Sequence, residues 1–155
     1  MGSVVPYELG DETQLVPKLR EADFAELTAT STRPPVELLR LGAEQSAPSC
    51  SILNAQGEVV GMFGVVPVTQ GCGRVWLLGS DELAKNPLRR QFIRESKHYL
   101  DGLFKQYPLL FNVIDERNTI HIRWLKWLHF TFIRRIPAYG LEQRPYLEFV
   151  RCVCH

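Results

Sequence analysis

The stretch NTIHIRWLKWLHF, residues 118–130, mixes polar side chains with aromatic and aliphatic ones. Its apolar residues recur at helical spacing, so we expect a short helix from Asn118 to Leu128. On that helix His121 shares one face with Leu125 and Leu128. A packed histidine with one backbone partner is therefore favoured over a catalytic base at His121.

The composition of the whole chain indicates an ordinary globular protein. Its 155 residues carry 18 basic and 17 acidic side chains, for a net charge of +1, and 45% of them are hydrophobic. This length suits a single domain over residues 1–155. The charge balance gives no direct sign of a nucleic-acid partner. Without a long apolar run or a targeting segment in residues 1–10, we expect a soluble protein without a membrane span.

The first half of the chain predicts one strand, two helices and a three-strand meander. The strand covers residues 4–9, and Asp11 can cap a helix that runs toward Thr30 with an interruption near Pro17. A second helix starts at Pro34 and Pro35 and is limited by Gly42 and Pro48. Apolar and β-branched runs separated by glycine turns then predict antiparallel strands at residues 50–55, 59–68 and 74–80.

The second half predicts a long helix that crosses between two parallel strands. Residues 86–107 have Asn86 as the expected N-cap and Pro87 at the first helical position. Because a buried strand at residues 109–114 follows, it should lie parallel to the strand at residues 73–79. Strands are also expected at residues 130–136 and 146–154. We therefore predict an α+β fold with a mixed, mostly antiparallel sheet, one splayed parallel pair and flanking helices.

The spacing of Asn118, Ile122, Arg123, Leu128 and Phe130 resembles a motif of the GCN5-related N-acetyltransferases (GNATs). Four blocks in order, residues 19–27, 62–68, 75–81 and 118–130, are similar to a bacteriophage family that includes the internal virion protein A of short-tailed phages. The resemblance implies a GNAT-like fold and acetyl-CoA as the candidate cofactor. It also implies phage virion or host proteins as partners, synthesis in the host cytoplasm and incorporation into the virion.

Two departures from the enzymes of this superfamily bear on activity. Their turn after the meander carries a glycine cradle for the cofactor pyrophosphate, whereas GSDELAKNPLRRQF, residues 79–92, has only Gly79. Leu125 stands where many of these enzymes have a tyrosine that protonates the leaving thiolate, and leucine cannot transfer a proton. We expect a virion-associated protein with weak or lost catalysis; a genuine acetyl-CoA-dependent N-acetyltransferase and a homodimeric regulator remain alternatives.

Several residues are candidates for a ligand site. Arg89 and Arg90 lie in the first turn of the long helix, where they could hold a phosphate group or form an exposed basic turn paired with Asp81 or Glu82. The resemblance adds Asn118 and the backbone of Trp76, Leu77 and Leu78 as cofactor-binding candidates.

The first helical region contributes a polar edge. Arg20, Asp23 and Glu26 recur at steps of three, so Asp23 can pair with Arg20. This edge is either a solvated face or, because the resemblance puts it beside the acceptor site, a functional patch. Glu26 is then the carboxylate candidate for binding an amine or accepting its proton.

The remaining histidines and cysteines give structural expectations. His129 stands where the GNAT resemblance has a glycine with positive φ, a conformation that costs histidine on the order of 1 kcal/mol. His98 should be exposed. Cys152 and Cys154 share a strand face, and packing there is favoured over a metal site formed by Cys154, His155 and either Cys50 or Cys72. We therefore expect no metal.

Overall fold

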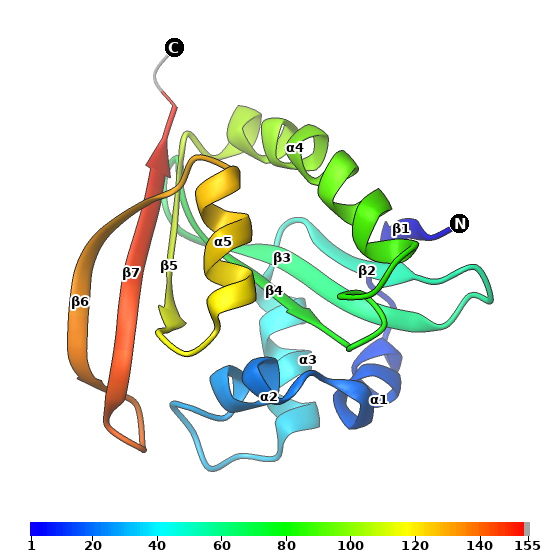
Figure 1. The fold of residues 1–155 in the computed structure, drawn as a ribbon, viewed down its shortest axis with the longest axis horizontal. Coiled ribbons are helices and arrows are strands. Elements are labelled where there is room, and N and C mark those ends of the chain that lie inside the picture. Colours follow the sequence, from blue (N-terminus) through cyan, green and yellow to red (C-terminus); the bar gives the residue numbers. More distant parts are fainter. Residues whose placement is uncertain (154–155) are drawn as a thin grey trace.

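The computed structural model describes residues 1–153 and contains one mixed seven-stranded sheet (Figure 1). The strand order is β1-β2-β3-β4-β5-β7-β6, with only β4 and β5 parallel. The predicted fold class is confirmed. The strands are β1 Ser3–Pro6, β2 Ser49–Leu53, β3 Val59–Thr69, β4 Cys72–Gly79, β5 Leu109–Asp115, β6 Thr131–Tyr139 and β7 Arg144–Cys152.

Helices cover both faces of this sheet. The first group is α1 Asp11–Leu15, a short 3-10 turn Val16–Lys18, α2 Glu21–Leu27 and α3 Pro35–Gln45; the second is α4 Leu88–Gln106 and α5 Thr119–Trp127. Leu15, Leu39 and Met62 form a core under the first group. Leu100, Leu110 and Leu125 belong to a second core under α4 and α5. The two groups therefore lie on opposite faces of the sheet.

Local details correct the sequence predictions at four places. The first strand ends at Pro6, and Gly10 rather than Asp11 is the N-cap of α1. The predicted interruption near Pro17 is confirmed, because the helical region is divided into α1, the 3-10 turn and α2. Helix α3 continues past Gly42 to Gln45. Pro87, rather than Asn86, occupies the N-cap position of α4, and no side chain caps that helix. Proline at this position lacks a side-chain acceptor, so the first turn of α4 has no capping hydrogen bond.

The predicted parallel pair is confirmed and opens along its length. Strands β4 and β5 pair at only three positions, from Cys72 with Leu109 to Arg74 with Phe111. The side-chain amide of Asn112 then donates to the Val75 carbonyl at 2.8 Å, so a side chain takes the acceptor that a continuing ladder would have used. Beyond this point the two strands diverge, as the topology predicts.

The end of α5 follows the prediction for His129. Its φ is +67°, and the Phe130 N–H donates to the Leu125 carbonyl at 3.1 Å. The predicted strained conformation is therefore confirmed. No helix in residues 1–153 is long and apolar enough to cross a membrane.

The cysteines differ in their burial. Cys50 and Cys72 are partly buried, whereas Cys152 is exposed. The prediction of Cys152 as a buried packing residue is wrong, because it lies near the end of β7 with its side chain turned to solvent. The expectations for Cys154 and His155 lie outside the described residues.

Candidate functional site

A cavity of about 520 Å³ occupies the opening between β4 and β5. Both divergent strands line it, and helices from the two faces close its sides. Its walls are mainly aliphatic and aromatic, with a few polar side chains, which is the usual composition of a small-molecule site. The polar lining residues include Glu26, Gln91, Glu95, Ser96, Asn112 and His121.

The polar edge of α2 is turned into the protein rather than to solvent, and Glu26 at its end lines the cavity. Asp23 is only 2% exposed. Its carboxyl oxygen Oδ1 lies 3.4 Å from Nη1 of Arg20, and Oδ2 accepts the Gly79 N–H at 2.8 Å. The predicted pairing with Arg20 is confirmed, and the solvated-face interpretation is wrong for Asp23. Burial raises the pKa of Asp23 despite these partners.

Asn118 joins α2 to the start of α5. Its amide nitrogen donates to Oδ1 of Asp23 at 3.3 Å and to Oε1 of Glu26 at 3.2 Å. Its own carbonyl oxygen accepts from Nη2 of Arg20 at 3.3 Å. Asn118 occupies the N-cap position of α5 but does not cap that helix. At 1% exposure, its side chain is fully engaged within the protein.

Glu26 is the ionisable group at the cavity wall with the most altered acidity. Its Oε1 accepts the Asp115 N–H at 3.1 Å in addition to the Asn118 amide, whereas Oε2 forms no hydrogen bond within residues 1–153. Burial, reinforced by the nearby Asp23 charge, raises the pKa of Glu26 to about 8. At neutral pH Glu26 is therefore mostly a neutral acid that can exchange a proton near physiological pH.

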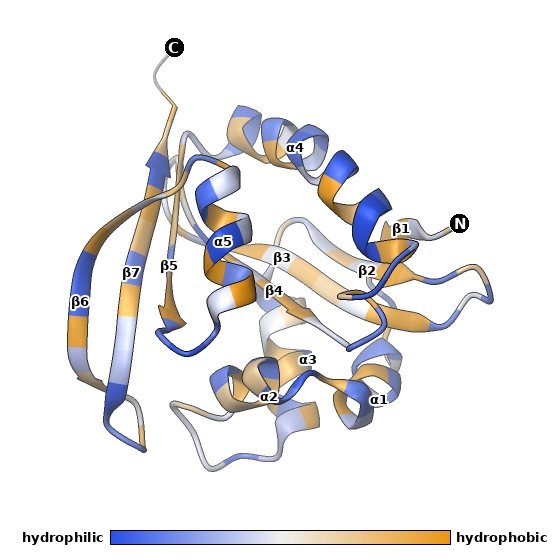
Figure 2. Cartoon of the chain, in the orientation of Figure 1, coloured by the Kyte–Doolittle hydropathy of each residue, from blue (hydrophilic) through white to orange (hydrophobic). Residues whose placement is uncertain are grey.

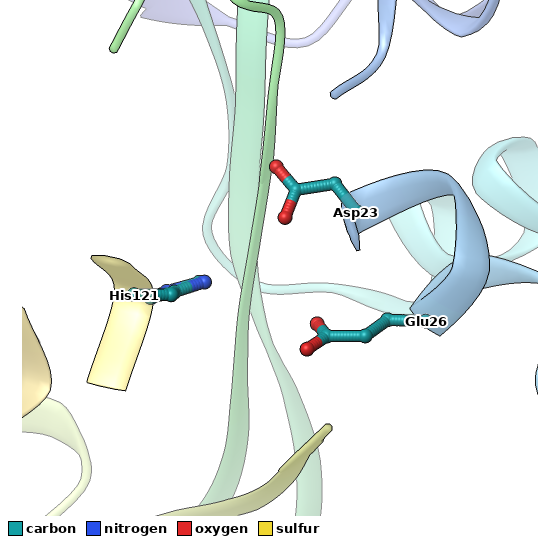
Figure 3. Close-up of side chains that lie close together, drawn as sticks. All are labelled: Asp23, Glu26 and His121. Carbon is teal, nitrogen blue, oxygen red and sulfur yellow. The ribbon is translucent and has the colours of Figure 1, made fainter. Parts of the chain in front are cut away.

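His121 points from α5 toward the two carboxyl groups of α2 (Figure 3). Burial and the Arg20 charge lower the pKa of His121 to about 4, so the imidazole is neutral at physiological pH. The ring packs on Trp124 with centroids 5.2 Å apart. It forms no hydrogen bond in the described part of the chain, so the predicted backbone partner is wrong. His98 is exposed, as predicted.

Among residues 1–153, Asp23, Glu26 and His121 form a group that could hold a metal ion. One ligand atom from each lies within 4.8 Å of the others. An imidazole and two carboxylates suit several divalent transition metals. However, the Arg20 guanidinium already supplies a positive charge to Asp23. The cluster is therefore better suited to holding protons than a divalent cation.

The other sequence candidates fall into two groups. Trp76, Leu77 and Leu78 line the cavity, and the Trp76 indole N–H donates to Oγ of Ser46 at 2.8 Å. Arg89 and Arg90 are exposed and do not line it. Neither arginine forms an ion pair within residues 1–153, so the predicted pairing with Asp81 or Glu82 is wrong.

The turn before α4 uses its own backbone donors. The N–H groups of Leu83, Ala84 and Lys85 donate to carbonyls of residues 80–82 at 3.1 to 3.2 Å. The Arg89 N–H donates to the Lys85 carbonyl at 2.9 Å. Phosphate binding at a helix N-terminus needs such donors to be available. Three N–H groups of the turn before α4, and that of Arg89 in the first turn of the helix, are therefore already satisfied.

Tyr139 and Tyr146 are two further residues of the cavity wall that the sequence did not indicate. Both line the cavity, and their ring centroids are 4.5 Å apart. Burial, together with the Glu26 charge, raises the pKa of Tyr146. They come from the β6–β7 hairpin, more than a hundred residues after α2, and no local pattern connects them to Glu26.

A family model described as "Bacteriophage T7, probable scaffold protein Gp13" matches residues 49–135, more than half of the chain. The chain belongs to this family. The match extends from β2 into β6 and thus includes the opened strand pair and α5. The phage association expected from the sequence is confirmed. No curated protein matches the chain.

Solved structures similar to this Gp13 family member include several N-acetyltransferases. Ard1 from Thermoplasma volcanium has a TM-score of 0.74 at 16% identity, over 99% of both chains. A GCN5-related N-acetyltransferase from Kribbella flavida has 0.71 at 15% identity, over 98% of both. Spermidine N-acetyltransferase from Vibrio cholerae, in complex with CoA and spermine, has 0.69 at 8%, over 97% of this chain and 95% of the other. These likenesses confirm the GNAT fold.

Proposed function

We propose that this protein is a phage assembly protein, associated with the interior of the virion, that uses a GNAT-like fold as a binding scaffold. Acetyl transfer by it is weak or lost. The observation that carries the proposal is the turn before α4, in which the N–H groups of Leu83, Ala84 and Lys85 are bonded to carbonyls of the turn itself. The family description as a probable scaffold protein supports the same role.

The cavity fits the pantetheine arm of acetyl-CoA better than its pyrophosphate. Its volume and apolar walls suit the pantetheine arm, which the backbone of Trp76, Leu77 and Leu78 could contact. The pyrophosphate lacks a glycine cradle, because three N–H groups of the turn are bonded within it and Pro87 has none. Arg89 and Arg90 are the remaining candidates for the phosphates, since they are exposed beside that turn. Asn118 could contribute only by giving up bonds to α2.

Complementation tests the assembly role separately from chemistry. A phage lacking its own copy of the gene is supplied with wild-type protein or with Glu26→Gln, and particles are counted and analysed by mass spectrometry. We expect both proteins to restore assembly and to be found with internal particle components. Restoration by wild type alone, with the variant shown to be folded, would overturn the scaffold proposal because it would make Glu26 chemistry necessary.

A second candidate function is N-acetylation of a host or phage amine with acetyl-CoA. It is favoured by Glu26, whose pKa of about 8 at the cavity wall suits a group that accepts a proton from an ammonium ion. The cofactor supplies the acetyl group, while Glu26 would hold the amine and take its proton. Acetylation of polyamines and protein N-termini, followed by mass spectrometry, tests this function. Product formation that Glu26→Gln abolishes would support it.

A further inference from the structure

The near-zero net charge of the chain conceals a strong separation of charge. Residues 1–60 contain four basic and nine acidic side chains, whereas residues 61–155 contain fourteen basic and eight acidic ones. The acidic part includes α1 to α3, and the basic part includes α4 and α5 on the opposite face of the sheet. Hydrophilic bands are visible along both α4 and α5 (Figure 2).

Four exposed cations and one aromatic side chain form a continuous surface on these two helices. Arg94 and Lys97 are one turn apart on α4, and Arg123, Lys126 and Trp127 are neighbours on α5. The Lys97 ammonium lies 4.1 Å from the centroid of the Trp127 ring, which joins the two helices. We call these five residues the α4–α5 basic surface.

The charges of this surface are not neutralised within the protein. None of its four cations forms an ion pair with a carboxylate in the described part of the chain. Asp101, four residues after Lys97, is on the same side of α4 and is also without an ion pair there. Glu95 instead accepts from the Gln91 amide and lines the cavity. The surface therefore presents a net positive charge to solvent.

We propose that the α4–α5 basic surface binds duplex DNA through its phosphate backbone. Lysine and arginine side chains that replace condensed counterions are the main source of such binding. Duplex DNA is favoured over a single strand, because single-strand sites rely on aromatic platforms for successive bases. Trp127 is the one aromatic residue of this surface, and Lys97 lies over its ring. The proposal is independent of both proposed functions, since it uses no cavity residue.

Fluorescence anisotropy of a labelled duplex tests the proposal at several salt concentrations. Four phosphate contacts predict a slope of about −3.6 in log K against log salt, which is roughly a 150-fold loss of affinity between about 50 and 200 mM salt. A single strand of equal length and poly-glutamate serve as competitors. We expect both to compete less well than the duplex. Equal or better competition by either one would overturn the assignment to duplex DNA.

A pair of matched variants locates the binding surface. Arg94→Ala with Lys97→Ala should reduce the salt slope to about −1.8 and weaken binding at low salt at least about tenfold. The control, Lys18→Ala with Arg33→Ala, removes the same charge from exposed positions in the acidic part and should leave the slope unchanged. Equal effects of the two double variants, or no effect of the first, would contradict the proposal. Circular dichroism checks that both variants are folded.

Discussion

The side-chain amide of Asn118 donates to Oε1 of Glu26 at 3.2 Å, across 92 positions of sequence. The same amide also reaches Asp23, so a single side chain holds two buried carboxyl groups of α2 against the start of α5. The asparagine that opens the diagnostic stretch therefore has a structural role that does not require catalysis.

Replacing Asn118 should destabilise the protein strongly. Asn118→Ala removes donors from two buried carboxyl groups and leaves the Arg20 guanidinium without one acceptor. Leaving such groups unsatisfied costs about 2 to 4 kcal/mol in the free energy of unfolding. Urea denaturation measures the loss. The exposed neighbour Thr119, changed to alanine, is the control and should alter stability by about 0.5 kcal/mol or less. Similar losses in the two variants would contradict this role of Asn118.

The stability of the protein should depend on the protonation of Glu26. Its pKa is about 8 in the folded chain and lies near 4.5 when the chain is unfolded. Between these values the folded state binds more protons than the unfolded state, so the free energy of unfolding falls as pH rises. Glu26→Gln keeps an acceptor at Oε1 and removes this titration.

The variant should therefore gain stability relative to wild type by a few kcal/mol as pH rises from about 4.5 to 8. Chemical denaturation at a series of pH values gives the difference directly. Glu21→Gln, at an exposed position on the same helix, is the control and should show a nearly constant difference. A constant difference for Glu26→Gln as well would mean that Glu26 is ionised normally in the folded protein.

The conformation of His129 offers a simple gain in stability. With φ at +67°, a glycine avoids the strain that a side chain meets there. His129→Gly should therefore raise the free energy of unfolding by up to about 1 kcal/mol, measured by thermal or urea denaturation. His98→Gly, within α4, should have the opposite sign because glycine destabilises a helix interior by about 1 kcal/mol. Loss of stability in His129→Gly would show that His129 contributes contacts that outweigh its strain.

Part of the site was predictable because local patterns determine it. The long amphipathic helix between two buried strands predicted the parallel pair, and that pair opens after Arg74 and Phe111. Helical spacing also predicted the shared edge of Arg20 and Asp23. It could not reveal that this edge is buried, because the covering residues come from distant segments. The partners of Asp23 are the Gly79 N–H and the Asn118 amide, which are 56 and 95 residues away in the sequence.

The environment of the cofactor candidates was less predictable. The sequence identified a turn with a single glycine, but the use of its N–H groups in internal hydrogen bonds depends on the path of residues 80–88. His121 was expected to pack with a backbone partner; instead it faces the acids of α2, which lie about a hundred residues earlier. Burial and neighbouring charge set its low pKa, and neither can be read from α5 alone.

Calorimetric titration of the wild-type protein with acetyl-CoA tests the central claim most directly. If the turn before α4 has lost its capacity to hold the pyrophosphate, we expect no saturable heat, with or without an added amine. The double variant Arg89→Glu with Arg90→Glu should then behave like wild type. Saturable micromolar binding by wild type that this variant abolishes, accompanied by transfer of the acetyl group to an amine, would contradict the scaffold account.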